Sequence, residues 1–236
     1  MLSSSTPVRL SLVARGPFLT GTRRRTSTPG TAHANIAASV TAPDGTQKDR
    51  WVARHSHQTV LQQHCDFFDT DNDGVIWPLD TYRGFRDLGF NILLSLIAVF
   101  IIHANFSYPT GNSIFPDPFF RLYVKNMHKA KHGSDTGTYD AEGRFIPQKF
   151  EDFFSKYGGD KDGLSKWDIW HGLKGQRVIM DPIGWFGAIF EWLATYIMLW
   201  PEDGIIKKED VRRVYDGSIF PHIASRRAGK TKTKAT

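Results

Sequence analysis

The chain has little cysteine and little acidic charge near its start. Cys65 is the one cysteine among 236 residues, so neither an intrachain disulfide nor a zinc site built on several thiolates can form. The first 43 residues contain no Asp or Glu and are rich in Ser, Thr and Arg. This composition fits an organelle transit peptide, but a disordered tail is the simpler interpretation, and the segment lacks the compact apolar run of a secretory signal.

Positive charge is concentrated at the two ends of the chain. The net charge is +6 and the pI is near 9.4, with basic clusters at residues 23–25 and 226–234. Basic ends beside apolar segments favour an anionic membrane surface, where each Lys or Arg contributes about 1 kcal/mol. Because no nucleic-acid-binding motif accompanies the charge, we expect no nucleic-acid partner.

The hydrophobic residues, 40% of the chain, are enough for a core and lie mostly between residues 51 and 220. Their spacing is mainly helical. We expect a mainly α fold organised as a disordered basic tail (1–50), a calcium-loop region (51–89), an apolar segment with prolines (90–118), a C-terminal helical region (119–220) and a basic tail (221–236).

Several segments have the periodicity of amphipathic helices. In residues 51–68, four side chains share one helical face: His57, Leu61, His64 and Phe68. A second helix is expected from about Leu79. Further helices are expected over residues 119–131, 147–157 and 207–215.

The twelve residues from Asp69 to Asp80 have the pattern of an EF-hand calcium loop. Carboxylates stand at positions 1, 3 and 5, a glycine stands at position 6, and position 7 offers a backbone carbonyl. The expected ligands of Ca2+ are Asp69, Asp71, Asp73, Val75 and Asp80. A solvated acidic turn is the alternative.

Position 12 departs from the usual pattern, because Asp80 stands where a bidentate Glu is common. The shorter side chain weakens calcium binding or favours Mg2+. No second complete loop follows, and a capping turn explains residues 160–163 better than a calcium-loop fragment does.

The segment from Phe90 to Ile102 is apolar except for Asn91 and Ser95. Thirteen residues make a helix of about 20 Å, which is short for a hydrocarbon core of about 30 Å. Pro109, Pro116 and Pro118 follow and should turn the chain back. A membrane hairpin, a monotopic insertion and a buried core helix all fit this pattern.

A second long apolar stretch runs from Pro182 to Trp200, in which Glu191 is the one charged residue. Its length would span a bilayer. The two glycines Gly184 and Gly187, the charge and the polar neighbours favour an amphipathic or core helix instead.

Three histidines stand beside apolar residues. His64 precedes the calcium loop, and the spacing of His128 and His132 predicts that both lie on one helical face. Each is more often an ordinary interfacial histidine than a ligand, although heme iron takes such an imidazole in an apolar pocket. Cys65 points about 100° away from His64 on a helix, so a buried, unreactive thiol is the better interpretation for it.

Four motifs in one order carry a family resemblance: Leu61–Asn91, the prolines after the apolar segment, Lys125–Phe145 and Val214–Phe220. Together they resemble the caleosin family, and the residues of these motifs are more similar to its fungal branch. The resemblance implies one EF-hand, a proline knot, heme b and peroxygenase activity. Such an enzyme moves one oxygen from a fatty-acid hydroperoxide to an unsaturated fatty acid or another acceptor.

The resemblance also implies site residues and a location. His64 and His132 match the family's two heme-associated histidines, and His128 matches a neighbouring one, so we expect these three as catalytic residues. If both matched histidines bound iron, no position would be open for peroxide; His64 is then the preferred ligand. Arg121 stands where seed members have a further proline, which leaves the depth of insertion open.

The implied location is the lipid droplet and the endoplasmic reticulum membrane, with monotopic association. The expected partners are a phospholipid monolayer or membrane, fatty acids and their hydroperoxides, and a homo-oligomer is left open. Two rival functions are a non-catalytic, calcium-regulated coat protein of the droplet surface and a soluble calcium sensor. The second fits poorly with the apolar segment.

Overall fold

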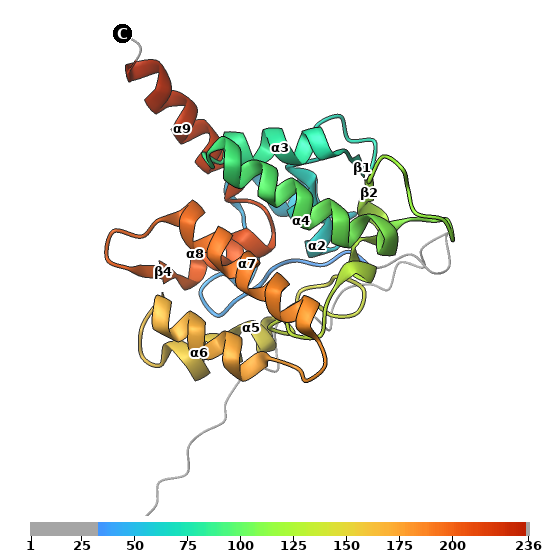
Figure 1. Cartoon of the computed structure of the whole chain (residues 1–236). Coiled ribbons are helices and arrows are strands. Elements are labelled where there is room, and N and C mark those ends of the chain that lie inside the picture. Colours follow the sequence, from blue (N-terminus) through green and yellow to red (C-terminus); the bar gives the residue numbers. More distant parts are fainter. Residues whose placement is uncertain (1–32, 235–236) are drawn as a thin grey trace, which may run out of the picture. The chain divides into compact units, whose positions relative to one another are not determined.

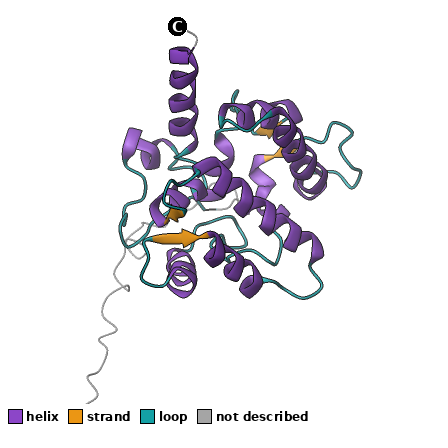
Figure 2. Cartoon of the chain, turned by 60° about the vertical axis from the view of Figure 1, so that its left-hand side comes forward, coloured by secondary structure: helices purple, strands orange, loops and turns teal. Residues whose placement is uncertain are grey.

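The computed structural model describes residues 33–234, which belong to one compact unit. Helices dominate this part of the chain, and the strands are short pieces of two or three residues (Figures 1 and 2). The prediction of a mainly α fold is confirmed. The expected tail at 1–50 lies largely outside the described residues.

The described chain joins the core well before Trp51, so the predicted start of the folded part is wrong. Ala37 and Thr46 are buried, and Asn35 exchanges hydrogen bonds with the backbone of Phe145, donating to its carbonyl at 2.9 Å and accepting from its N–H at 3.2 Å. The residues of 33–50 that contact the core are small or polar, so they give no apolar periodicity in the sequence.

The predicted helix over 51–68 is two helices. A 3-10 turn η2 (Lys48–Arg50) leads into α1 (Trp51–Arg54), and α2 (Val60–Asp66) starts anew after a turn. Thr59 and Gln62 form a capping box at the start of α2, a Thr-x-x-Gln signal that is present in the sequence. His57 lies in the intervening turn and is exposed, so it does not share a face with His64.

The acidic loop lies between α2 and a second helix, α3 (Pro78–Asp87), and contains β1 (Val75–Ile76). This strand does not pair with a second calcium loop. It pairs antiparallel with β2 (Leu122–Tyr123), with Val75 opposite Tyr123 and Ile76 opposite Leu122. The acidic loop is thereby joined to the chain that follows the prolines.

The apolar segment belongs to a helix longer than the expected thirteen residues. α3 is followed by Gly89, whose φ of +88° suits glycine, and α4 (Ile92–Thr110) then runs for 19 residues, about 28 Å. Pro109 is accommodated in its last turn. After α4 the chain turns back through residues 111–121 to β2, as the prolines predict.

Residues 119–131 were expected to be an α-helix, and this prediction is wrong. The segment contains β2 and the 3-10 helix η3 (Val124–Ala130), which ends before Lys131. Tyr123 is an aromatic residue that suits an extended strand, and the pairing of Leu122 and Tyr123 with β1 decides between strand and helix.

The C-terminal half repeats one order of elements twice. α5 (Pro147–Gly158), β3 (Gly163–Ser165) and α6 (Lys166–Gln176) are followed by α7 (Pro182–Leu199), β4 (Ile205–Lys207) and α8 (Lys208–Tyr215). β3 and β4 pair antiparallel. The helices expected at 147–157, 182–200 and 207–215 are confirmed. In each repeat, a short strand lies in the connection between the two helices.

Three clusters of buried side chains hold these elements together. Phe145, Phe150 and Phe153 belong to the cluster under α5 to α8. A second cluster joins α3, α4, α7 and the end of the chain, and a third lies between α2, β2 and η3. A final helix, α9 (Phe220–Lys234), continues the chain where a basic tail was expected.

Candidate functional site

A cavity lies where α2, α4, α7 and α8 approach one another, and its lining is mostly apolar. The cavity has a volume of about 260 Å³, close to the lower end of the range found for ligand pockets. His64, Cys65 and His132 all line it.

His64 is held by the backbone of another element. Its Nδ1 lies 2.7 Å from the carbonyl oxygen of Val214 in α8, so Nδ1–H donates and the proton is placed on that nitrogen. Within the described residues Nε2 makes no hydrogen bond. Burial lowers the pKa of His64. The ring is therefore a neutral imidazole with a free Nε2, the form that binds a metal.

His132 has a different electrostatic environment. Its Nε2 lies 3.6 Å from Oε1 of Glu191 on α7, and this carboxylate raises the pKa of His132. Nδ1 of His132 is buried and has no partner in the described part of the protein. His132 and Glu191 together are thus suited to hold or move a proton. Glu191 also lines the cavity. It was not among the predicted site residues, although a lone charged residue in an apolar helix was a signal for it in the sequence.

His128 and His132 do not share a helical face. His128 lies in η3, which ends at Ala130, and His132 follows in extended backbone. His128 is not among the described residues that line the cavity. The spacing of four residues predicted neighbours, but a 3-10 helix has about three residues per turn.

Cys65 and two tyrosines, Tyr139 and Tyr215, also line the cavity. Burial raises the pKa of Cys65 to about 12, so the side chain is a thiol and not a thiolate ligand at neutral pH. Tyr139 donates its hydroxyl proton to the carbonyl of Tyr215 at 2.5 Å, and the Tyr215 hydroxyl lies 2.8 Å from that of Thr136. These bonds fix both rings at the cavity wall.

The second candidate site is the acidic loop after α2. Carboxylate oxygens of Asp69, Asp71 and Asp73 lie within 4.8 Å of one another, the spacing that one cation requires. Asp69 is buried and accepts the N–H groups of Asp73 at 3.2 Å and Gly74 at 2.9 Å. Burial raises the pKa of its carboxyl group.

Asp80 does not lie in this carboxylate cluster. Its Oδ2 accepts the N–H of Trp77 at 3.0 Å, which caps the start of α3. The other oxygen is 4.0 Å from Arg83. The side chain would have to leave the cap to reach a cation, whereas Val75 stays beside the cluster, with its N–H bonded to Asp73 at 2.7 Å.

The acidic loop is bound firmly to the segment after the prolines. The guanidinium of Arg121 lies 5.2 Å from the Trp77 ring and donates to Asp117 at 2.8 Å. Val124 N–H donates to the Gly74 carbonyl at 3.0 Å. Arg121, which departs from the seed-type proline knot, therefore connects the loop to this segment.

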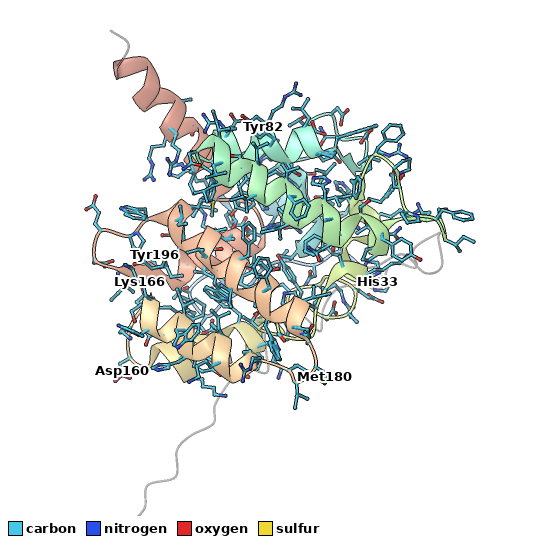
Figure 3. The ribbon with its side chains drawn as sticks, in the orientation of Figure 1. His33, Tyr82, Asp160, Lys166, Met180 and Tyr196 are labelled. Carbon is cyan, nitrogen blue, oxygen red and sulfur yellow. The ribbon has the colours of Figure 1, made fainter. Side chains whose placement is uncertain are left out.

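Two long helices expose apolar side chains. α4 and α7 have mean hydropathies of 1.8 and 1.2 over 18-residue windows, of which 22% and 17% are buried, so both are long and apolar enough to cross a membrane. They run across the near side of Figure 1. Figure 3 shows Met180, 88% exposed, pointing away at the turn before α7.

Comparison with known proteins identifies the family. A family model described as caleosin related protein matches residues 56–224, and the chain belongs to the caleosin family. It is 41% identical over 205 residues to a protein of Lilium longiflorum named peroxygenase, a match covering 86% of this chain and 84% of that protein.

Two relatives from Arabidopsis thaliana carry related names. One, named probable peroxygenase 4, is 37% identical over 175 residues, or 74% of this chain and 90% of its own. The other, named probable inactive peroxygenase-like protein, is 29% identical over 150 residues, or 63% of this chain and 72% of its own. No solved structure matches.

Proposed function

We propose that this protein is a heme-dependent peroxygenase that binds calcium and acts at a lipid surface. The relatives named peroxygenase support the reaction class. The observation that carries the cofactor assignment is the pair His64 and His132, which come from separate segments to one apolar cavity in different protonation environments.

The chemistry of the cavity lining fits heme b. It offers a neutral imidazole with a free Nε2, a buried nitrogen without a partner on the opposite histidine, and an apolar wall. Heme would supply the iron that takes up the hydroperoxide and the redox chemistry of oxygen transfer. His64 would hold the iron, with the Val214 carbonyl orienting its ring.

His132 and Glu191 would supply acid–base catalysis. With Nε2–H directed at Glu191, Nδ1 of a neutral His132 is free to take the hydroperoxide proton and return it to the departing alcohol oxygen. One oxygen would then pass to the acceptor alkene, so that a fatty-acid hydroperoxide plus an unsaturated fatty acid would yield an alcohol plus an epoxide. In this division of roles His64 alone would hold the iron.

The acidic loop would bind Ca2+ through Asp69, Asp71, Asp73 and the Val75 carbonyl. The three clustered carboxylates and the backbone-bonded Asp69 support this ligand set. Asp80 would join only by giving up its bond to Trp77. Binding would stabilise the fold and order the segment held by Arg121.

Asp69→Ala should weaken calcium binding at least about tenfold, because it removes the position-1 carboxylate and two loop-closing hydrogen bonds. Titration calorimetry on both forms measures this. Asp160→Ala, an exposed carboxylate in the loop before β3, is the matched control. Asp80→Glu should tighten binding if the short side chain limits it. An unchanged isotherm for Asp69→Ala would remove the calcium assignment.

We propose monotopic association with the lipid droplet and the endoplasmic reticulum membrane. α4 exposes Leu93 (67%), Leu96 (53%) and Phe100 (73%), and α7 exposes Ile183 and Phe186. The chain turns back after α4, so insertion of these faces requires no crossing. Fatty acids and their hydroperoxides would then reach the cavity from the lipid layer.

Changing Leu93, Leu96 and Phe100 together to Asn should release the protein from lipid droplets. Burying three such side chains in lipid contributes about 5 kcal/mol, and because all three are exposed the fold should remain. Droplet flotation of the triple variant measures the effect, with Val40→Asn, 70% exposed elsewhere, as control. Undiminished flotation would mean that α7, and not α4, anchors the protein to the droplet.

A non-catalytic coat protein of the droplet surface is the second candidate, favoured by the relative named inactive. Assays on the purified protein distinguish these two functions. A peroxygenase shows a Soret band and epoxidises an unsaturated fatty acid only when a fatty-acid hydroperoxide is added. A protein that binds droplets and calcium without either property would be the coat protein.

A further inference from the structure

A second pocket, away from the heme cavity, is lined by basic side chains. It lies between the segment 46–54 and the junction of α8 with α9, and its volume is about 360 Å³. Its ionisable lining residues are Lys48, Asp49, Arg54, Arg213 and His222. We call it the basic pocket. Cations outnumber carboxylates in it three to one, with His222 neutral.

The three cations of the basic pocket form no close ion pair with a carboxylate of the described residues. Within the described residues no ion pair within 4.0 Å involves Lys48, Arg54 or Arg213. Instead, the Lys48 ammonium lies 3.4 Å from Nδ1 of His222, and Arg213 donates to the Ser218 carbonyl at 3.2 Å. Because the cations outnumber the pocket's one carboxylate, they repel one another, and an anion would stabilise the arrangement.

A buried donor supplies independent support. Trp51 lines the pocket and is 5% exposed, and its indole Nε1–H is buried without an acceptor in the described part of the protein. Leaving such a donor unpaired costs about 1–3 kcal/mol. The indole is held between two neighbours: its ring stacks on His55 at 3.9 Å, and the Arg54 guanidinium lies 5.5 Å from it.

We propose that the basic pocket binds a phosphate group, with Lys48, Arg54 and Arg213 as counter-charges and Trp51 Nε1–H as a hydrogen-bond donor. Arg and Lys together with neutral N–H donors match the several oxygens of a phosphate. The pocket has room for more than the phosphate itself, so the ligand is a phosphate monoester. It is either a small soluble molecule or a phospholipid headgroup. This proposal is independent of the heme and of peroxygenase activity.

His222 offers an internal reporter. Lys48 lowers the pKa of His222, and burial and the neighbouring Arg213 and Arg226 act in the same direction, whereas Asp210 opposes them. Asp49, the pocket's own carboxylate, lines the same space. A bound phosphate offsets the cations and should raise this pKa. The NMR titration of the His222 ring, assigned with His222→Gln, records the shift.

Binding of sn-glycerol 3-phosphate to the full chain should be saturable by calorimetry. Lys48→Ala and Arg213→Ala should each weaken it about tenfold, whereas Lys174→Ala, an exposed lysine on α6, should leave it unchanged. Trp51→Phe keeps the aromatic ring and removes the unpaired N–H. It should therefore weaken binding about tenfold while leaving the melting temperature unchanged or higher.

Vesicles distinguish the two sources of phosphate. The measured quantity is the increase in binding when phosphatidic acid is added to phosphatidylcholine vesicles. If Lys48→Ala and Trp51→Phe lose this increase but Lys174→Ala keeps it, the ligand of the basic pocket is a lipid headgroup. If the variants keep the increase and the unmodified protein binds glycerol phosphate saturably, the ligand is a soluble monoester. The proposal is overturned if neither probe responds to these variants, or if the His222 titration is unchanged by glycerol phosphate.

Discussion

His64→Ala should lose most of its heme and, with it, nearly all peroxygenase turnover. The substitution removes the one cavity imidazole whose Nδ1 proton is committed to a backbone carbonyl and whose Nε2 is free. The remaining cavity histidine has a carboxylate 3.6 Å from Nε2 that raises its pKa, which disfavours the neutral form that binds iron. Heme content from the Soret band and turnover with a fatty-acid hydroperoxide measure the two losses separately.

His132→Gln and Glu191→Gln should behave differently from His64→Ala. We expect each to keep most of the heme and lose about 100-fold or more in turnover, the usual contribution of a positioned acid or base. His128→Ala, which changes a histidine outside the described cavity lining, is the matched control and should keep both properties. Full heme and full turnover in His64→Ala would refute the ligand assignment, and heme loss in His132→Gln equal to that in His64→Ala would indicate two ligands.

Arg212→Met should lower the free energy of unfolding by about 3–5 kcal/mol, the usual result of removing one partner of a buried ion pair. Arg212 is 1% exposed and donates to Asp216 at 3.2 Å, to the Thr46 hydroxyl at 2.8 Å and to the Ala37 carbonyl at 2.6 Å. The change leaves Asp216, also 1% exposed, without its counter-charge. Urea denaturation measures the effect.

The matched control is Arg83→Met, because that guanidinium is largely exposed and its ion pair is 4.0 Å long; it should change stability by less than about 1 kcal/mol. Adding Asp216→Asn to Arg212→Met should cost less than the sum of the two single changes, because the unpaired buried charge disappears. Strict additivity in this cycle would show that the two side chains do not stabilise each other.

The elements that follow from local sequence are those with strong signals of their own. The acidic loop is one, since its carboxylate spacing and its glycine are encoded within twelve residues. The helices α5, α7 and α8 are others, because their apolar periodicity extends over two or more turns. The resemblance that identified the family rests on the same local motifs.

Elements whose structure depends on distant partners were predicted wrongly. Tyr123 and its neighbours form a strand because β1 pairs with them, and no local pattern reports that pairing. Residues 33–50 are held by backbone contacts to Phe145 and by the buried Arg212. A segment without apolar periodicity has the sequence pattern of a disordered tail, even when it forms hydrogen bonds to the core.

The sequence by itself determined that His64 and His132 belong to the candidate site, and tertiary structure decided how they differ. Nothing local to His64 predicts that Val214, 150 residues later, fixes its Nδ1 proton, or that Glu191 approaches His132 and raises its pKa. A histidine's proton is placed by whatever acceptor lies within hydrogen-bonding distance, and only the folded chain sets that distance. The same holds for the basic pocket, where cations from residues 48–54 and 213 meet only after α8 packs against the start of the described chain.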